Sequence, residues 1–301
     1  MMNNLTHTPL ARIGIISDTH MPLRYPHLPE SIAQCFADVD LILHAGDVGE
    51  LWVLDQLSAY APVVAVHGND ETHEAQRELP YSQVVSVRGT RLLLCHSHHP
   101  DYAEEMASRR INAWQPKFER WAAMARRANA SIFVYGHTHI PTAHWQAGIL
   151  LVNPGAIASG SIRMRQIVQS VAVLSLYADQ PPQVQHVNLT TCQPFSAALD
   201  LEGGFRAAFE RYSESILAAD LAEVWTEMEG QVLRLMHQPE QAATFERLLE
   251  VVISAATPCW LRQKDQITRA EMQAALLAAR GDPHIPDSLL DTLLKPLENG
   301  A

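Results

Sequence analysis

Acidic and imidazole side chains follow a short apolar run near the start of the chain. Asp18 and His20 come directly after the run at 13–17, and residues two apart in an extended chain point to the same side. A carboxylate and an imidazole are therefore directed at one point, which is a combination that metal ions bind. By itself the pair also fits an ordinary polar strand end.

The next two apolar runs end in the same manner. The second ends in His-Ala-Gly-Asp at 44–47, and the third ends in His-Gly-Asn-Asp-Glu at 67–71. In open α/β sheets, ligands bind beyond the carboxyl ends of the strands. Gly46 and Gly68 permit tight turns and close backbone approach, which lets the donor atoms converge. Because Asp and Asn are also good helix N-caps, capping explains some of the same residues.

Two later motifs repeat the two-residue spacing with histidine alone. His96 pairs with His98, and His137 pairs with His139. A single buried histidine is usually a satisfied core group, but histidine pairs at two strand ends, beside three acidic or amide turns, require a common explanation. Metal binding provides it. Asp, Asn and His donors without thiolate favour manganese, iron, zinc, nickel or cobalt over calcium, which takes oxygen ligands.

A carboxylate between two groups of donors can bridge two metal ions. Asp47 lies at the middle one of the three strand ends, so it is the natural bridge. Two ions about 3.5 to 4 Å apart can lower the pKa of a bridging water and clamp the oxygens of an in-line displacement at phosphorus. The constellation therefore predicts phosphoester hydrolysis.

The elements that position these motifs alternate short strands with helices from residue 12 to about 189, which predicts an α/β fold. Helices are expected at 31–37 and 50–59. The expected strands lie at 13–17, 41–44, 63–67, 84–87, 92–96, 132–135, 149–152 and 170–176. An insertion at 101–129 predicts a long helix interrupted at Pro116. Its arginines either form a lid for an anionic substrate or belong to an ordinary solvated face.

A Pro-containing stretch at 179–194 marks a change of composition. It predicts a first domain at 1–190 and a helical region at 191–301, where apolar residues follow helical spacing. A capping box formed by Thr268 and Glu271 predicts the start of one of its helices. This region could cap the active site, form an interface between copies of the chain, or dock a partner, and its sequence does not choose.

The composition of the 301-residue chain is that of a folded protein, with 47% hydrophobic and 18% charged residues. Its formal net charge of -11 argues against broad attraction to nucleic acid or an anionic membrane surface. The N-terminus has no basic or apolar leader region, and no apolar run is long enough to cross a bilayer, so we expect a cytoplasmic protein. The four cysteines are widely spaced and are expected to act as small apolar residues.

In order and combination, the motifs resemble those of the calcineurin-like metallophosphoesterase superfamily. Within it, the chain is similar to the small bacterial and archaeal phosphodiesterase branch, which also includes the retromer scaffold subunit. The resemblance covers roughly residues 11–190 and implies a two-sheet α/β sandwich, followed here by an all-helical extension. The matching motifs are Ser17-Asp18-Thr19-His20, Gly46-Asp47, Gly68-Asn69, His96-Ser97-His98, Gly136-His137-Thr138-His139 and Asn153-Pro154-Gly155.

The resemblance also implies a set of metal ligands and a mechanism. The ligands divide between two divalent ions, with Asp18, His20 and His139 on the first, Asp47 as the bridge, and Asn69, His96 and His137 on the second. A metal-bound hydroxide would then attack the phosphorus of a small phosphoester substrate. We expect manganese, with iron, zinc, nickel or cobalt as the other candidates.

Two positions depart from the family pattern. Asp70 stands where many relatives place a histidine after the motif asparagine, so the acid that protonates the leaving group is open between Asp70 and His98. Ser97 stands where the small branch often has glycine. His98, together with Asn69, could contact the phosphate, and an imidazole also titrates in the range suited to an acid. A supporting hydrogen bond explains His98 equally well.

Three functions fit these motifs. A phosphodiesterase is preferred because of the resemblance to the small branch, and a phosphomonoesterase would use the same site. A non-catalytic, protein-binding scaffold on the same fold is the alternative from another class, and lost ligands would support it. Because every expected ligand position carries a competent side chain, we prefer the enzyme.

Overall fold

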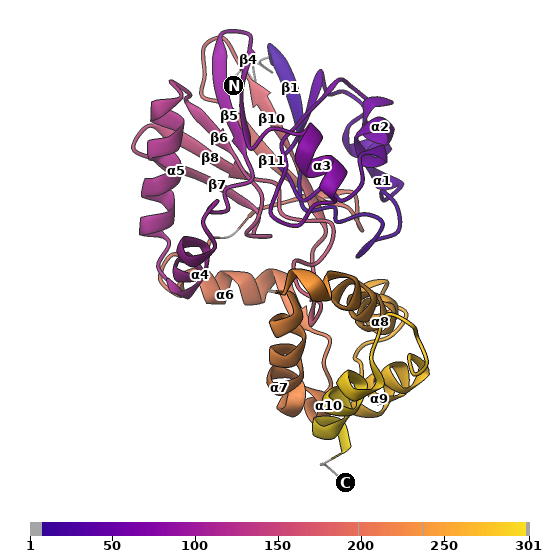
Figure 1. Cartoon of the computed structure of the whole chain (residues 1–301). Coiled ribbons are helices and arrows are strands. Elements are labelled where there is room, and N and C mark those ends of the chain that lie inside the picture. The colour runs from indigo at the N-terminus through magenta and orange to yellow at the C-terminus, as the bar shows by residue number, and fades with distance from the viewer. Residues whose placement is uncertain (1–7, 198, 237, 299–301) are drawn as a thin grey trace. The chain divides into compact units, whose positions relative to one another are not determined.

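The computed structural model describes residues 8–298 except 198 and 237 (Figure 1). The expectation about the N-terminus therefore rests largely on residues outside the described part. The chain forms two compact units, one from Met1–Gly160 and Gln166–Ser213 and the other from Ser161–Arg165 and Glu214–Ala301. It passes from one unit to the other after Gly160 and again within β9 (Met164–Gln166) and β13 (Ser213–Ser215).

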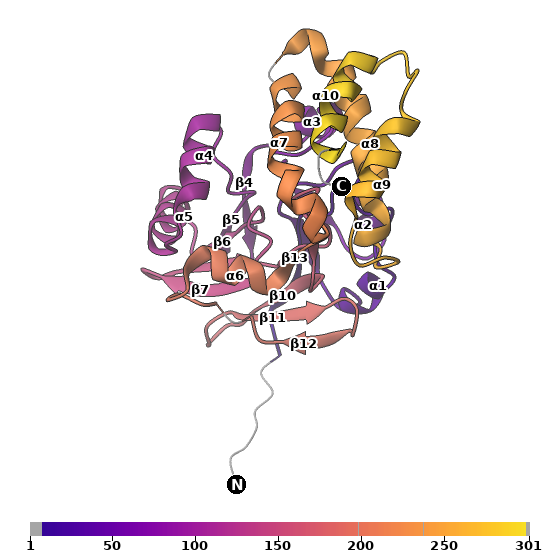
Figure 2. The ribbon, with the colours of Figure 1, turned by 90° about the horizontal axis from the view of Figure 1, so that it is seen from below.

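The first unit contains a six-stranded sheet in the order β12-β11-β10-β1-β2-β3, whose outer strands β10 to β12 lie side by side in Figure 2. Strands β1, β2 and β3 are parallel to one another, so their carboxyl ends lie at one edge of the sheet. Helices α1 (Ser31–Cys35) and α2 (Trp52–Ser58) connect them. The strands are β1 (Ala11–Ile16), β2 (Leu41–His44), β3 (Val63–Ala65), β10 (Ser170–Leu176), β11 (Gln183–Asn188) and β12 (Gln193–Phe195).

A second sheet in this unit has five strands in the order β4-β5-β6-β8-β7. Strands β5, β6 and β8 are parallel, so they too deliver their carboxyl ends to one edge. The short helix α3 (His73–Glu78) precedes the sheet and is capped by Thr72. The strands are β4 (Ser82–Val87), β5 (Thr90–Cys95), β6 (Ile132–Val134), β7 (Thr142–Gln146) and β8 (Ile149–Asn153).

The two sheets pack face to face. One buried cluster contains Ile13 and Ile15 of β1 together with Leu92 and Leu94 of β5. On the other face of the first sheet, Ile16 packs in a separate cluster with side chains of α1 and α2, as the two-residue period of a strand buried on both faces requires. Helices lie outside both sheets (Figure 1). This arrangement confirms the predicted two-sheet α/β sandwich.

The insertion forms two helices, α4 (Tyr102–Arg110) and α5 (Gln115–Arg127), instead of one interrupted helix. The break comes before Pro116, which lies in the first turn of α5. Proline is tolerated there because the backbone N–H that it lacks would have no acceptor within the helix. Helix α5 buries Phe118 and Trp121 against the second sheet.

The first unit continues past residue 190, where the sequence pattern places a boundary. Strand β12 pairs with β11, and α6 (Gly204–Tyr212) packs Ala208 and Tyr212 into the cluster that also contains Trp121. The change of composition predicts a boundary at residue 190, whereas the packed first unit extends to Ser213.

The second unit is built from helices, as expected for the C-terminal extension. They are α7 (Ala219–Met236), the short 3-10 helix η1 (Pro239–Gln241), α8 (Ala242–Trp260), α9 (Arg269–Ala278) and α10 (Asp287–Glu298). Its buried cluster contains Leu221, Trp225, Leu248 and Leu290. The predicted capping box of Thr268 and Glu271 is present at the start of α9. Within the described chain, no helix is long and apolar enough to cross a membrane.

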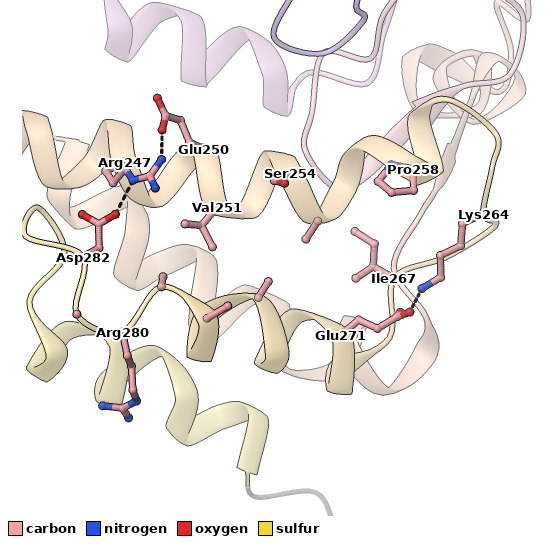
Figure 3. A pocket seen from close by; sticks show the side chains of 15 residues that line it. Arg247, Glu250, Val251, Ser254, Pro258, Lys264, Ile267, Glu271, Arg280 and Asp282 are labelled. Carbon is pink, nitrogen blue, oxygen red and sulfur yellow. Dashed lines mark hydrogen bonds and ion pairs between the residues drawn. The ribbon is translucent and has the colours of Figure 1, made fainter.

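A hollow of about 660 Å³ lies between α8 and α9 in this unit (Figure 3). Small and apolar side chains such as Val251 line it, and ion pairs stand at its two ends. Arg247 pairs with Asp282 at one end, and Lys264 pairs with Glu271 at the other. Opposite charges at its rim therefore neutralise one another.

Candidate metal centre

Strand ends from both sheets bring five of the seven predicted ligands together, and the other two, Asn69 and His137, lie outside the two donor groups that these five form. Asp18 and His20 follow β1, and Asp47 follows β2, while the histidine pairs follow β5 and β6 of the other sheet. Two overlapping groups of donors result, and in each of them the donor atoms lie within 4.8 Å of one another. The groups are Asp18, His20 and His139, and Asp18, Asp47 and His96. The first group has the composition that the resemblance implies for one ion.

Ring nitrogens in this centre face carboxylate oxygens at short range. His139 Nε2 lies 3.0 Å from Asp18 Oδ1, and His96 Nε2 lies 3.2 Å from Asp47 Oδ2. His20 Nε2 lies 3.5 Å from the same oxygen of Asp47. The Nε2 atoms of His20 and His96 are buried and form no hydrogen bond. A bound cation would replace the proton of His96 beside Asp47 and would satisfy the Nε2 atom of His20, so the residues fit a metal site.

The electrostatics of the centre keep both carboxylates ionised. Burial raises the pKa of Asp18, but the neighbouring imidazoles of His139 and His96 outweigh it and the pKa falls to about 2. The pKa of Asp47 also lies well below its usual value, because His96 and His20 overcome the effect of burial. Ionised carboxylates are the form that binds metal ions.

The two imidazoles beside Asp47 differ in their protonation. Burial lowers the pKa of His20 to about 4, assisted by Arg24, so His20 is neutral at neutral pH. Burial also disfavours the charged form of His96, but the nearby Asp47 dominates and raises the pKa of His96 to about 10. In the metal-free protein His96 therefore carries a proton that a metal ion would have to displace.

Five of the predicted ligands have backbone conformations that residues other than glycine seldom adopt. Their φ angles are 54° for Asp18, 46° for His20, 53° for Asp47, 68° for His137 and 58° for His139. Such left-handed conformations are uncommon outside glycine and cluster at functional sites, where the surrounding structure maintains them. The strands thus end in turns that direct these side chains toward one another.

Two motif glycines are required by close packing. A Cβ on Gly68 would lie 2.0 Å from Asp47 Oδ1, and a Cβ on Gly136 would lie 2.0 Å from Ser17 Oγ. Neither distance leaves room for a carbon atom. The loops of the centre can therefore approach one another only because these positions carry no side chain.

The predicted ligand Asn69 and the candidate acid Asp70 lie beside Asp47. Asn69 is exposed, and the backbone N–H of Asp70 donates a hydrogen bond of 2.8 Å to Asp47 Oδ1. The carboxylate of Asp70 lies 3.5 Å from His20 Nδ1 and forms an ion pair with Arg24. The structure therefore brings Asp70 to the centre, where its carboxylate pairs with the guanidinium of Arg24.

His98, the second candidate acid, lies near the other histidines. Its ring centroid is 5.6 Å from that of His96 and 6.2 Å from that of His137. His98 Nδ1 is buried without a hydrogen-bond partner. Burial, followed by the two neighbouring histidines, lowers the pKa of His98 to about 3, so its imidazole is neutral at neutral pH.

The centre contains a structural carboxylate to which the sequence pattern assigned no role. Glu71 accepts hydrogen bonds of 3.0, 2.9 and 2.9 Å from the backbone N–H groups of Val48, Gly49 and Gly68. Burial and the charge of Asp47 raise its pKa to about 7. The side chain of Glu71 thus joins the turns after β2 and β3. In the sequence, only its position two residues after Asn69 indicates that it could lie at the centre.

Two further charged residues reach the centre from segments outside the motifs. Arg24 donates a hydrogen bond of 2.9 Å to the carbonyl of Ser159 and pairs with Asp70. The Oε1 atom of Glu105, on insertion helix α4, lies 2.7 Å from His137 Nε2. Burial alone would raise the pKa of Glu105, but the hydrogen bonds from His137 and Arg109 lower it. Motif spacing gives no signal for either residue, because both reach the centre only through tertiary folding.

Asn153 stabilises the turn that carries the last histidine pair. Its side-chain amide donates hydrogen bonds of 2.8 Å to the carbonyl of Gly136 and 3.1 Å to Thr138 Oγ1. The backbone carbonyl of Asn153 in turn accepts a hydrogen bond of 2.8 Å from His186 Nε2 on β11. These hydrogen bonds link β11 of the first sheet, through Asn153 of the second sheet, to the turn that carries His137 and His139.

Several known proteins are similar to part of this chain. The family model of the calcineurin-like phosphoesterase superfamily domain matches residues 11–179. A probable metallophosphoesterase of Methanothermobacter thermautotrophicus is 33% identical over 144 residues, which are 48% of this chain and 76% of the relative. A phosphodiesterase of Methanocaldococcus jannaschii is 24% identical over 159 residues, 48% of this chain and 82% of the relative. A solved structure of a Vps29 variant from Entamoeba histolytica aligns with a TM-score of 0.48 and 20% identity, covering 62% of this chain and 99% of that chain.

Proposed function

The chain belongs to the calcineurin-like phosphoesterase superfamily, and we propose that it is a phosphodiesterase with two divalent metal ions in its active site. The observation that carries the proposal is the pair of overlapping donor groups at Asp18, with unsatisfied ring nitrogens on His20 and His96. The diester preference is supported by the relative named as a phosphodiesterase, although that relative shares only 24% identity. The substrate would be a small diester, and we expect hydrolysis to occur in the cytoplasm.

The residues that would hold the ions are those assigned from the motifs. Asp18, His20 and His139 would bind the first ion, Asp47 would bridge, and Asn69, His96 and His137 would bind the second. In the structure Asp18 is common to both donor groups, which is compatible with two closely spaced cations. When bound, the ions would lower the pKa of a water and neutralise charge on the phosphoryl oxygens. Manganese is the proposed metal, and iron, zinc, nickel or cobalt would suit the same mixture of nitrogen and oxygen donors.

Arg24 is positioned to attract the anionic substrate. A local positive charge is needed because the formal net charge of the chain is -11. The guanidinium of Arg24 is fixed by the carbonyl of Ser159 and by Asp70, which itself lies near His20. Because the Asp70 carboxylate already pairs with Arg24, we propose that Asp70 holds Arg24 in place and that His98 is the candidate to protonate the leaving group.

His98 is then the residue proposed to contact the reacting phosphoryl group, together with the exposed amide of Asn69. A neutral imidazole carries one ring N–H, which can donate a hydrogen bond to a phosphoryl oxygen or to the leaving oxygen. The closeness of its ring to the rings of His96 and His137, which would bind the second ion, supports this role.

The proposal is tested by measuring hydrolysis of a chromogenic phosphodiester and of its monoester with manganese-loaded protein. The Asp47→Asn variant should lose diester turnover by about 100-fold or more, as expected when one group that stabilises the transition state is removed. Asp55→Asn makes the same change at an exposed position of α2 and should retain full activity.

Other outcomes of this assay would contradict parts of the proposal. Faster turnover of the monoester would make the protein a phosphomonoesterase that uses the same site. If neither ester is hydrolysed although two ions are bound, catalysis is contradicted and a protein-binding scaffold becomes the better explanation. None of these outcomes tests the role of residues 191–301, so capping of the active site, self-association and partner docking stay predictions.

A further inference from the structure

Insertion helix α4 places one buried carboxylate against the metal centre. Glu105 is 7% exposed, whereas its neighbour Glu104 on the same helix is exposed. Oε1 of Glu105 lies 2.7 Å from His137 Nε2 and 2.7 Å from Arg109 Nε. Oε2 accepts a hydrogen bond of 2.9 Å from the backbone N–H of His99. Three groups therefore hold this carboxylate in one position.

The contact with Glu105 decides which nitrogen of His137 can bind a metal ion. A neutral imidazole has one N–H and one nitrogen with a free lone pair. Because an ionised carboxylate can only accept, Nε2 must carry the hydrogen, and the lone pair then lies on Nδ1. The backbone N–H of His137 donates to the carboxylate of Asp18 at 3.1 Å, so the main chain of this residue is fixed as well.

We propose that Glu105 is a positioning residue for the second metal ion, because its carboxylate holds His137 in the tautomer whose free lone pair lies on Nδ1. The inference rests on the proposed two-metal site and adds a residue from a segment outside the motifs. It also gives the insertion a function: α4 contributes to metal affinity through His137. Carboxylates that orient ligating histidines in this way typically change metal affinity by about 10- to 100-fold when they are mutated.

Direct coordination by Glu105 fits the structure less well. Both of its oxygens already accept hydrogen bonds, from His137 and Arg109 on one side and from His99 on the other. As a ligand it would have to give up at least one of these contacts. Because its contact occupies Nε2 of His137, Nδ1 is the ring nitrogen that would remain for the ion.

Manganese titration of the metal-free protein tests the proposal without an activity assay. Wild-type protein should bind two Mn²⁺ ions, and Glu105→Ala should weaken one of the two sites by about 10- to 100-fold while the other keeps its affinity. Glu105→Gln should recover much of the loss, because the amide oxygen accepts the same hydrogen bond. Glu104→Ala removes an exposed carboxylate one residue away and should change neither site.

A second measurement does not depend on a variant that folds. Nitrogen-15 NMR of the histidine rings in metal-free wild-type protein at pH 8 should show His137 protonated at Nε2 and unprotonated at Nδ1. The opposite tautomer would overturn the proposal, and so would wild-type affinity at both sites in Glu105→Ala or an equal loss at both. If the wild-type protein itself binds fewer than two ions, the proposed function fails first, and this result is distinct from a failure of Glu105 alone.

Discussion

At the scale of single residues, the metal-free centre has a definite protonation pattern. Asp47 raises the pKa of His96 to about 10, while burial keeps His20 neutral near pH 7. His96 must therefore lose a proton before it can bind a metal ion, whereas His20 is already neutral. Competition between a proton and a metal ion is an equilibrium that can be measured.

Manganese affinity should therefore rise with pH. Protonated His96 cannot ligate, so between pH 6 and pH 9 the apparent affinity should increase by up to about tenfold per pH unit as the competing proton is removed. Titration calorimetry at several pH values, in buffers of different ionisation enthalpy, would report both the affinity and the number of protons released. An affinity that does not change across this range, with no proton release, would contradict the assignment of His96.

The close approach at Gly68 gives a steric prediction. Gly68→Ala would place a Cβ 2.0 Å from Asp47 Oδ1 and force that carboxylate to move. We expect loss of manganese binding and a fall in hydrolysis of about 100-fold or more. Gly230→Ala in α7, where a Cβ meets no atom within 4 Å, is the matched control and should leave both properties unchanged. Normal metal binding in Gly68→Ala would show that Asp47 is not a ligand.

At the scale of elements, apolar runs located most of the strands that carry motifs. The expected strand at 170–176 coincides with β10, and the expected strand at 41–44 coincides with β2. Strands β7 and β11 were not predicted, because neither contains a continuous apolar run: polar residues interrupt both, although β11 buries His186 and Val187. Pairing with a neighbouring strand, which a single sequence does not reveal, forms these elements.

The motif residues of the candidate centre were also accessible from the sequence, but its supporting charges were not. Histidine and carboxylate spacing at strand ends is a local pattern, and it identified Asp18 and His139, which the fold brings within 3.0 Å of each other. Arg24 and Glu105 reach the centre from a loop and from the insertion. Their contacts depend on long-range packing, and neither residue belongs to a recurring spacing.

The contact between β11 and the last residue of β8 predicts a pH effect on stability. Burial lowers the pKa of His186 to about 4, below the value of 6.5 for an exposed histidine. The unfolded chain therefore binds a proton more readily than the folded protein does, so stability is complete above pH 6.5 and falls as the pH drops toward 4. The decrease in melting temperature over this range should be smaller in His186→Gln than in wild type. Equal pH profiles would contradict this assignment.

At the scale of the whole molecule, the chain combines two units with separate apolar cores. The proposed catalytic residues all belong to the first unit, and the clusters that stabilise them contain residues of its two sheets and their helices. The helical unit buries its own cluster around Trp225 and Leu248. Stability and metal binding should therefore be separable by mutation.

Thr268→Ala tests this separation. Removing the N-cap of α9 should cost about 0.5–2 kcal/mol of stability, because the backbone N–H of Glu271 loses its acceptor. Urea denaturation would measure this loss, and manganese titration of the folded variant should give wild-type affinity. Weaker metal binding would show that the centre depends on the helical unit.

The central claim is that the motif residues hold two divalent metal ions, and crystallography with anomalous scattering tests it most directly. A crystal of the protein prepared with manganese should show two anomalous peaks, one among Asp18, His20 and His139 and the other among Asp47, His96 and His137. A peak elsewhere in the molecule with none among these residues, or no peak at saturating manganese, would contradict the two-metal centre.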